Sequence, residues 1–225
     1  MDILLVAATS LEIAPTFEHL ERHFQKHPDG VYENVGTRVL PLVTGIGIAA
    51  TAWHLGRYFA LFRPDWALNA GIAGAFHHTL HLGDVVQVAS ERYGDLGVEE
   101  ADGQFADLFD LGLAAPNEPP FREGVLKNPA AEQTAFLPLA HGLTVNRVHG
   151  CTGSIESVLK KYPDVQVETM ESAAFFQACL LAEVPFVALR SISNYVEPRN
   201  RAAWQIGPAV ERLNAVVVEM LMMVK

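Results

Sequence analysis

Continuous apolar runs alternate with stretches of helical periodicity along most of this chain. A short, uninterrupted apolar run is typical of a strand buried on both faces, whereas apolar residues three and four positions apart indicate a helix. The run at 184–193 is the clearest strand. These patterns predict strands at 2–8, 30–35, 37–45, 65–74, 83–90, 142–150 and 184–193, helices at 11–24, 46–62, 155–162 and from about 208 onward, and a strand that passes into a helix at 164–183.

The first and last predicted helices carry clear apolar stripes. Ser10 stands where its side chain can cap the first helix by accepting a hydrogen bond from a free backbone N–H group. Pro64 ends the helix at 46–62, because proline cannot continue a helix. The positions predicted to be buried are Leu11, Phe17, Leu20 and Phe24 in the first helix and Val210, Leu213, Val217, Met220 and Leu221 in the last.

Between 94 and 138 the composition shifts toward Gly, Pro, Asp and Glu. We predict a long excursion with some short helix, of the kind that is functional or poorly ordered in compact domains. Elsewhere, alternating strands and helices predict an α/β fold of three layers, with a central mixed, largely parallel, twisted sheet flanked by helices. We expect one domain over 1–225, with ligands at the carboxyl ends of the strands.

Composition and charge narrow the class of protein. Half of the 225 residues are hydrophobic and 19% are charged, as in a compact globular protein. The formal net charge of −10 argues against a nucleic-acid-binding protein, which needs a basic surface. No apolar run approaches the roughly 20 residues of a membrane span, and Asp2 stands where a signal peptide carries positive charge. We therefore expect a cytoplasmic protein that binds neither nucleic acid nor membrane.

Metal and cofactor motifs are not found in the sequence. Cys151 and Cys179 form no CxxC pair, and the nine histidines show no zinc spacing; Cys179 lies in an apolar stretch and is predicted to be core. Glycine turns follow two strands, at Gly45 and Gly47 in "TGIG" and at Gly71 in "NAGIAG". They allow either close approach of a ligand or tight packing. Neither matches a dinucleotide or Walker motif, so we expect no metal and no cofactor.

The segment "VETMESAA" places Glu168 and Glu171 at a strand–helix junction in apolar surroundings. A buried carboxylate needs a partner, and a ribose 2′,3′-diol satisfies both of its oxygens. The alternative is that Glu171 caps the helix, whose N-terminus favours negative charge.

Together these segments resemble the purine nucleoside phosphorylase and nucleosidase superfamily. The resemblance rests on "GIG" after an early strand, "NAGIAGAF", "VETMESAAFFQACLLAEVPFVALRSISN" and the first strand followed by Glu12. It spans nearly the whole chain, and 94–138 is the least matched part. The stretch "SISNYVEPRNRAAW" is most similar to the futalosine hydrolase branch. That branch implies an N-ribosyl hydrolase that releases hypoxanthine from futalosine in an alternative pathway to menaquinone.

The resemblance also implies roles for individual residues. The superfamily's nucleosidases use the glutamate after the first strand to activate water, and Glu12 occupies that place. Their ribose-binding methionine and glutamate match Met170 and Glu171. This chain is one residue longer ahead of the methionine, which leaves the role of Glu168 open. Adenine-specific members carry an aspartate, which protonates N7 of the base, where this chain has Asn194.

The amide of Asn194 changes the expected leaving group. An amide can donate to O6 of a 6-oxopurine and accept from N7–H, whereas adenine presents an amino donor at that edge. A buried mismatch of this kind costs roughly 1–3 kcal/mol. Asn194 therefore indicates hypoxanthine or guanine as the base. The alternative is that Asn194 stabilises a turn.

Other functions remain open at this point. A phosphorylase needs cations around its phosphate, and the glycine turns have none adjacent; Arg38, Arg57 and Arg63 are predicted to lie on the surface. Hydrolysis is favoured over phosphorolysis. The alternatives are a methylthioadenosine/adenosylhomocysteine nucleosidase, an inosine phosphorylase and a non-catalytic nucleoside-binding protein. Comparing the bases released from paired substrates separates the enzymes.

The resemblance leaves the far end of the substrate and the assembly less defined. Futalosine carries an aromatic carboxylate beyond the 5′ carbon, for which the candidate contacts are Phe105, Trp204, Arg199 and Arg201. A backbone contact to the base is expected at Val148, and His149 beside it is interpreted as a hydrogen-bonded bystander. A homo-oligomer, a dimer or tetramer, is expected, with the helix after Ile46 at an interface.

Overall fold

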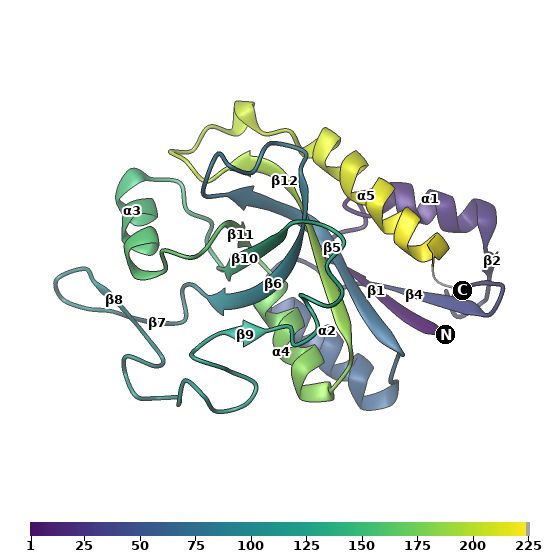
Figure 1. Cartoon of the computed structure of the whole chain (residues 1–225), viewed down its shortest axis with the longest axis horizontal. Coiled ribbons are helices and arrows are strands. Elements are labelled where there is room, and N and C mark those ends of the chain that lie inside the picture. The colour runs from purple at the N-terminus through teal and green to yellow at the C-terminus, as the bar shows by residue number, and fades with distance from the viewer. Residues whose placement is uncertain (224–225) are drawn as a thin grey trace.

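The computed structural model describes residues 1–223 (Figure 1). The elements follow one another along the chain as β1 (Asp2–Ala7), α1 (Ala14–His23), β2 (Gln25–Lys26), β3 (Tyr32–Asn34), β4 (Thr37–Val43), α2 (Ile48–Leu61), β5 (Trp66–Ala75), β6 (Val85–Tyr93), β7 (Gly97–Glu99), β8 (Phe105–Asp107), β9 (Leu126–Lys127), β10 (Leu139–Thr144), α3 (Thr152–Lys161), β11 (Val167–Thr169), α4 (Ser172–Ala182), β12 (Phe186–Tyr195), a 3₁₀ turn η1 (Arg201–Ala203) and α5 (Ile206–Met223).

One large mixed sheet organises the molecule. Its strands lie in the order β11-β10-β6-β12-β5-β1-β4-β3-β2, with β9 added to β6. The longest pairings, β12 with β5, β1 with β4 and β10 with β6, are parallel. Antiparallel pairs join β12 to β6 and β11 to β5. The predicted mixed sheet is therefore confirmed.

The short strand β11 closes one end of this sheet on itself. It pairs with β10 on one side and with β5 on the other, so β5, β12, β6, β10 and β11 form a ring of paired strands. Because β11 runs antiparallel to β5, closure brings Val167 and Glu168 beside the carboxyl ends of β5 and β12. Residues that are far apart in sequence thus meet at one end of the ring.

Helices cover both faces of the sheet, which gives three layers (Figure 1). The side chains of β1 alternate between the faces, as a strand period of two requires. Leu5 packs with Leu20 of α1 and Leu213 of α5, whereas Leu4 packs with Leu55 of α2 and Phe175 of α4. Each such buried side chain contributes about 1.5–3 kcal/mol of hydrophobic stabilisation. Cys179 is buried in the second core, as predicted.

Two features of the first helix differ from prediction. Ser10 does not cap α1, whose N-cap is Ile13 without a side-chain hydrogen bond, and Leu11 is 77% exposed rather than buried. The helix starts later because Pro15, with its fixed φ, lies in its first turn, and the preceding residues form a turn of their own. Leu20 is buried, as the apolar stripe predicts.

The prediction of a short helix within 94–138 is wrong, because none of the helices that the structure describes in 1–223 lies in this segment. The segment instead carries the β7–β8 hairpin, β9 and turns. Asp107 shows one cause, because its Oδ1 accepts hydrogen bonds from the backbone N–H groups of Phe109 and Asp110, at 2.9 and 3.0 Å. Such side-chain bonds compete with helix formation.

Across 1–223, no helix combines the length and apolar character that a bilayer span requires.

Candidate active site

Glu12 lies directly after β1, and its carboxylate is held on both oxygens. Oε2 accepts hydrogen bonds from the backbone N–H and the hydroxyl of Thr9, both at 3.0 Å, and Oε1 accepts one from the backbone N–H of Ile72 at 3.2 Å. The side chain is half-buried. A carboxylate fixed by three donors keeps spare lone pairs and one orientation, which a general base requires.

The backbone at Glu12 is anchored by the last helix. The buried side chain of Asn214, on α5, donates from Nδ2 to the carbonyl oxygen of Glu12 at 2.8 Å. Its Oδ1 accepts from the backbone N–H and the hydroxyl of Thr16, at 3.0 and 2.5 Å. Asn214 therefore joins the segment around Glu12 and the start of α1 to α5. Nothing in the apolar stripe of the last helix predicted this role.

Glu171 lies at the N-cap of α4 but does not cap it. Its side chain makes no capping hydrogen bond; instead Oε1 accepts one from the backbone N–H of Gly47 at 2.8 Å. Gly47 has φ of +94°, a conformation that favours glycine. The alternative that Glu171 caps the helix through its side chain was therefore wrong. Gly45, with φ of +83°, belongs to the same turn.

Glu171 lies close enough to Glu12 for their charges to interact. Burial raises the pKa of Glu171 above its ordinary value, the Gly47 N–H and the Arg190 guanidinium act against this, and Glu12 adds to the rise. Met170 is half-buried in the same turn, directly before Glu171. The two carboxylates thus share one end of the sheet with a buried cation.

That cation, Arg190 on β12, was missed by the sequence analysis. It is 2% exposed and donates hydrogen bonds to the side chains of Asn69 and Ser172 and to the carbonyl oxygen of Leu189. Burial lowers the pKa of Arg190, and nearby carboxylates oppose that effect. An arginine inside an apolar strand was the available signal, because a buried charge needs partners.

Gly71 leaves the space in which Glu12 and Arg190 approach each other. A Cβ at this position would lie 3.1 Å from Oε1 of Glu12 and 3.5 Å from the guanidinium of Arg190. The close approach of Glu12 and Arg190 therefore explains why position 71 is a glycine, and a contact of Gly71 with substrate stays a prediction.

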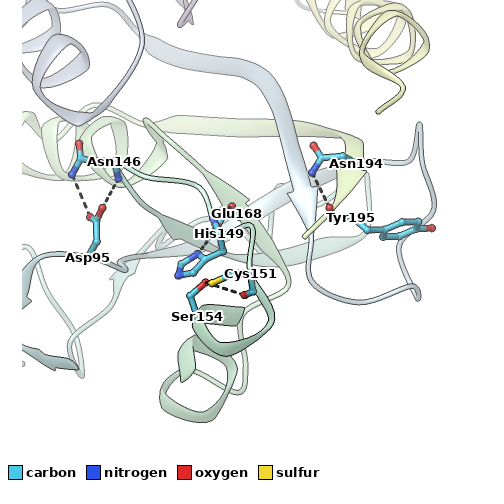
Figure 2. A network of polar contacts seen from close by, with 8 residues as sticks. All are labelled: Asp95, Asn146, His149, Cys151, Ser154, Glu168, Asn194 and Tyr195. Atoms are coloured by element: carbon cyan, nitrogen blue, oxygen red, sulfur yellow. Dashed lines mark hydrogen bonds and ion pairs between the residues drawn. The ribbon is translucent and has the colours of Figure 1, made fainter. Parts of the chain in front are cut away.

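A cavity opens where β5, β11 and β12 end. Its lining includes Gly74, Val148, His149, Glu168, Asn194 and Trp204. Oδ1 of Asn194 accepts from the hydroxyl of Ser193 at 2.8 Å. Nδ2 of Asn194 donates to the carbonyl oxygen of Tyr195 at 3.0 Å (Figure 2). These bonds fix which end of the amide carries oxygen. They leave one N–H and one lone pair for a ligand.

Glu168 brings a buried carboxylate to the same cavity. Its Oε1 pairs closely with Nδ1 of His149, and its Oε2 accepts from the backbone N–H of His149 at 3.1 Å (Figure 2). The imidazole is the hydrogen-bonded partner that the sequence analysis expected. Oε2 retains a free lone pair.

Asp95 fixes the loop that carries Val148 and His149. Its two carboxylate oxygens accept from the backbone N–H and the side-chain amide of Asn146, at 2.6 and 3.2 Å (Figure 2). The predicted strand at 142–150 accordingly ends at Thr144, and the loop turns along the cavity wall.

The Glu12 cluster and the cavity lie at the same end of β5. Glu12 bonds to Ile72, and Asn194 is paired with Gly74, two positions further along that strand. Two strand residues span on the order of 7 Å. The carboxylate of Glu12 and the amide of Asn194 are thus attached at neighbouring positions along one strand. Such an arrangement suits cleavage between a sugar and a base.

Only some of the candidate contacts for the far end of the substrate lie at the cavity. Arg199 and Trp204 line the cavity, with the guanidinium 5.2 Å from the ring centre. Arg201 is exposed in η1. Phe105, on β8, lies instead beneath the ammonium group of Lys161 of α3, at 5.6 Å from its ring centre, and is not among the residues of the cavity wall.

The arginines considered for phosphate lie outside the site. Arg57 and Arg63 are exposed, and Arg38 pairs with Asp2 at 3.0 Å. Within 1–223, no group of three or more His, Cys, Asp or Glu side chains is arranged to hold a metal ion.

Comparison with known proteins places the chain in a family. A model described as the phosphorylase superfamily matches residues 2–222. The futalosine hydrolase of Streptomyces coelicolor is 34% identical over 181 residues, which cover 78% of this chain and 75% of that protein. The 5′-methylthioadenosine/S-adenosylhomocysteine nucleosidase of Bacillus velezensis is 31% identical over 167 residues, covering 73% and 71%.

A solved structure extends the likeness to the fold. The 5′-methylthioadenosine/S-adenosylhomocysteine nucleosidase of Neisseria meningitidis, in complex with methylthio-immucillin-A, has a TM-score of 0.78 at 21% identity and covers 99% of both chains. This likeness confirms the predicted nucleoside phosphorylase-like fold. With the family match over 2–222, it follows that the chain belongs to the phosphorylase superfamily.

Proposed function

We propose that this protein is a nucleosidase that hydrolyses the N-glycosidic bond of futalosine, releasing hypoxanthine and dehypoxanthine futalosine in menaquinone biosynthesis. The related futalosine hydrolase and 5′-methylthioadenosine/S-adenosylhomocysteine nucleosidase, at 34% and 31% identity, support N-ribosyl hydrolysis as the reaction class. The choice of base needs support from the site itself.

The combination of Asn194 and Glu168 in one cavity carries the choice of hypoxanthine. Hypoxanthine presents a carbonyl at O6, a donor at N1–H and, as it departs, a donor at N7–H. The amide supplies a donor and an acceptor, and the carboxylate supplies an acceptor for N1–H. Adenine has a lone pair at N1, which a carboxylate repels. Each unmatched buried group costs roughly 1–3 kcal/mol, about a factor of 5–150 in specificity.

The proposed mechanism assigns the sugar to the carboxylate pair. Glu171 accepts hydrogen bonds from the ribose diol, beside Met170, and its negative charge stabilises the oxocarbenium-like transition state. Glu12 takes a proton from water as the water oxygen bonds to the anomeric carbon, a role typically worth 10²–10⁴-fold. As the sugar–base bond breaks, its electron pair goes to the purine, and N7 takes up a proton from solvent water. Asn194 stabilises the charge that develops there.

The charges of the site favour water over phosphate as the nucleophile. Glu12 and Glu171 both present negative charge to the sugar side, where a phosphate would be repelled. Arg190, the buried cation near them, already donates to protein oxygens. We therefore propose hydrolysis rather than phosphorolysis.

The 5′ substituent and the assembly belong to the same proposal. Trp204 and Arg199 line the cavity and offer a ring and a cation to the aromatic carboxylate of futalosine, with Arg201 nearby in sequence. Val148 offers a backbone contact beside the base. Exposed apolar side chains on and after α2, including Trp53 and Phe62 at 64% and 59% exposure, support a homo-oligomer, a dimer or tetramer.

A second candidate function is that of a 5′-methylthioadenosine/S-adenosylhomocysteine nucleosidase, which the 31% identity of the Bacillus velezensis protein favours. An inosine-type phosphorylase remains the third. These three enzymes differ in the base that they release and in whether they need phosphate.

One experiment separates them. The purified protein is incubated without phosphate with futalosine, inosine and methylthioadenosine, and the released base is identified by chromatography. We expect hypoxanthine from futalosine, with kcat/KM about 10–100-fold above that for methylthioadenosine, and no change on adding phosphate. Faster release of adenine would identify the second candidate, and phosphate-dependent release with ribose 1-phosphate as product the third. Binding without cleavage would indicate a nucleoside-binding protein.

A further inference from the structure

Glu91 is a fully buried carboxyl group beside the candidate site, and the mechanism above gives it no role. It lies on β6 with no exposed surface. Its Oε2 accepts a hydrogen bond from the hydroxyl of Thr144 at 2.9 Å. Its Oε1 is sealed from solvent and has no hydrogen-bond partner among residues 1–223. Burying a polar atom without a hydrogen-bond partner costs free energy, so the presence of Glu91 here needs an explanation.

The neighbouring strand makes room for this carboxyl group. Gly142 lies on β10 where a Cβ would be 2.1 Å from Oε1 of Glu91 and 2.5 Å from its carboxyl carbon. No side chain fits there without displacing Glu91. The backbone of β10 therefore accommodates Glu91 specifically.

Thr144 connects Glu91 to the turn that carries Met170 and Glu171. The hydroxyl oxygen of Thr144 accepts from the backbone N–H of Ala173 and lies 2.8 Å from the hydroxyl oxygen of Thr169. Because the one hydroxyl proton of Thr144 goes to Glu91, its lone pairs are left for Ala173 and Thr169. Both ends of the turn are thus tied to one hydroxyl that Glu91 orients.

The charge state of Glu91 also affects the site. Burial raises the pKa of Glu91 to about 8, while Arg190 and the hydroxyls of Thr144 and Ser172 act in the opposite direction. Arg190 faces Glu91 from β12, and Tyr93 lies on the same strand as Glu91. Thr144 of β10 and Ser172 of α4 present hydroxyl groups to it. At neutral pH the group is therefore a neutral acid. When Glu91 is neutral, the positive charge of Arg190 interacts with the carboxylates of Glu171 and Glu12.

We infer that Glu91 is a positioning residue that holds the turn from Thr169 to Ala173 in its sugar-binding form by orienting the hydroxyl of Thr144. This inference rests on the proposed nucleosidase function. Glu91 acts through Thr144 and Arg190 and makes no contact with substrate. Its loss is expected to weaken sugar binding in the ground state and transition state alike, and hence to act mainly on KM.

The test compares Glu91→Gln, Glu91→Ala and Gly142→Ala with the wild type between pH 6 and pH 9. The substrate is whichever of futalosine, inosine and methylthioadenosine the wild type cleaves fastest. An amide at 91 still accepts from Thr144 and is neutral at every pH, whereas alanine removes the acceptor and the methyl group at 142 displaces it. Gly153→Ala is the matched control, because no atom lies within 4 Å of the added methyl group.

An ionised Glu91 would compete with Glu171 and Glu12 for the charge of Arg190. We therefore expect the wild-type KM to rise about tenfold from pH 7 to pH 9, since the neutral fraction of a group with pKa about 8 falls by that factor. Glu91→Gln should keep its pH 7 value, within threefold of wild type, up to pH 9. Glu91→Ala and Gly142→Ala should raise KM at least tenfold at pH 7, with kcat changed less, and Gly153→Ala should change neither.

A Glu91→Gln variant whose KM rises with pH as in the wild type would overturn the inference, even if the two alanine variants fail to fold. A KM equal to that of the wild type in both Glu91→Ala and Gly142→Ala would also overturn the inference. A wild type that cleaves none of the three nucleosides would overturn the proposed function, and this inference with it. Wild-type cleavage of one of these nucleosides, together with a KM that rises with pH in Glu91→Gln as it does in the wild type, would overturn this inference alone.

Discussion

Glu168 of β11 and Asn194 of β12 are paired with the same residue, Gly74 of β5, one on each side of that strand. Neighbouring strands lie about 4.8 Å apart, so the carboxylate and the amide are held roughly 10 Å apart at their backbones, with a glycine between them. This spacing leaves room for a planar ring between two polar side chains. The pairing with β11 arises because that strand closes the ring of the sheet.

The glycine between them should be essential to the cavity. A Cβ at Gly74 would lie 3.0 Å from Nδ2 of Asn194 and 2.9 Å from Cγ2 of Val196. Gly74→Ala should therefore displace the amide and lower kcat/KM for the purine nucleoside by about 10–100-fold, since small misplacements at a reacting centre are costly. Gly56→Ala, which meets no atom within 4 Å, is the control in steady-state assays. Equal activity of the two variants would contradict this prediction.

Removing the charge of Glu12 should stop turnover and spare binding. Glu12→Gln keeps the size of the side chain but cannot take a proton from water, so kcat should fall by about 10²–10⁴-fold. Isothermal titration with the nucleoside should give a dissociation constant close to that of the wild type. Glu18→Gln, an exposed change on α1, serves as the control. A kcat within tenfold of wild type would exclude Glu12 as the base.

Asn194→Asp should shift the preferred base. A carboxyl group can protonate N7 of adenine and accept from its amino group, but it repels O6 of hypoxanthine. The ratio of kcat/KM for methylthioadenosine to that for futalosine should rise about 10–100-fold. Competition assays with both nucleosides in one mixture measure this ratio directly. Asn34→Asp, on β3, should leave it unchanged, and an unchanged ratio in Asn194→Asp would argue against a base contact.

Glu91 should make stability depend on pH. Its pKa is about 8 in the folded protein against 4.5 ordinarily, so between these values the folded state keeps a proton that the unfolded state has released. Stability from this group is therefore lost as pH rises from about 4.5 to 8, by up to a few kcal/mol. Glu91→Gln lacks this dependence, and its melting temperature should exceed that of the wild type increasingly from pH 5 to pH 8. A constant difference across that range would contradict the raised pKa.

Much of the sheet was predictable because its strands are continuous apolar runs. The runs at 2–8 and 184–193 correspond to β1 and β12, which lie near the middle of the sheet and are buried on both faces. The start of α1 was not predictable in the same way. Ser10 suits a helix cap by type, but Thr9 and Glu12 bond to each other, and Pro15 sets the first turn. Local preference was outweighed by contacts at the site.

The candidate site was predictable only in part, for a related reason. Glu12, Glu171 and Asn194 could be proposed because they follow strands at positions that match a family. Arg190 interacts with Glu12 and Glu171, and Glu91 interacts with Arg190, across elements distant in sequence, and no local pattern signals such pairing. What the sequence did offer was Arg190 within the apolar run at 184–193, whereas Glu91 lies directly after the predicted strand at 83–90.

Asn214 ties the carbonyl of Glu12 to a helix 202 positions further along the chain. A ribosome therefore finishes the first strand and its glutamate long before it makes the residue that anchors them. The backbone anchor of Glu12 can therefore form only after the chain through Asn214 has been made and α5 has docked against the sheet.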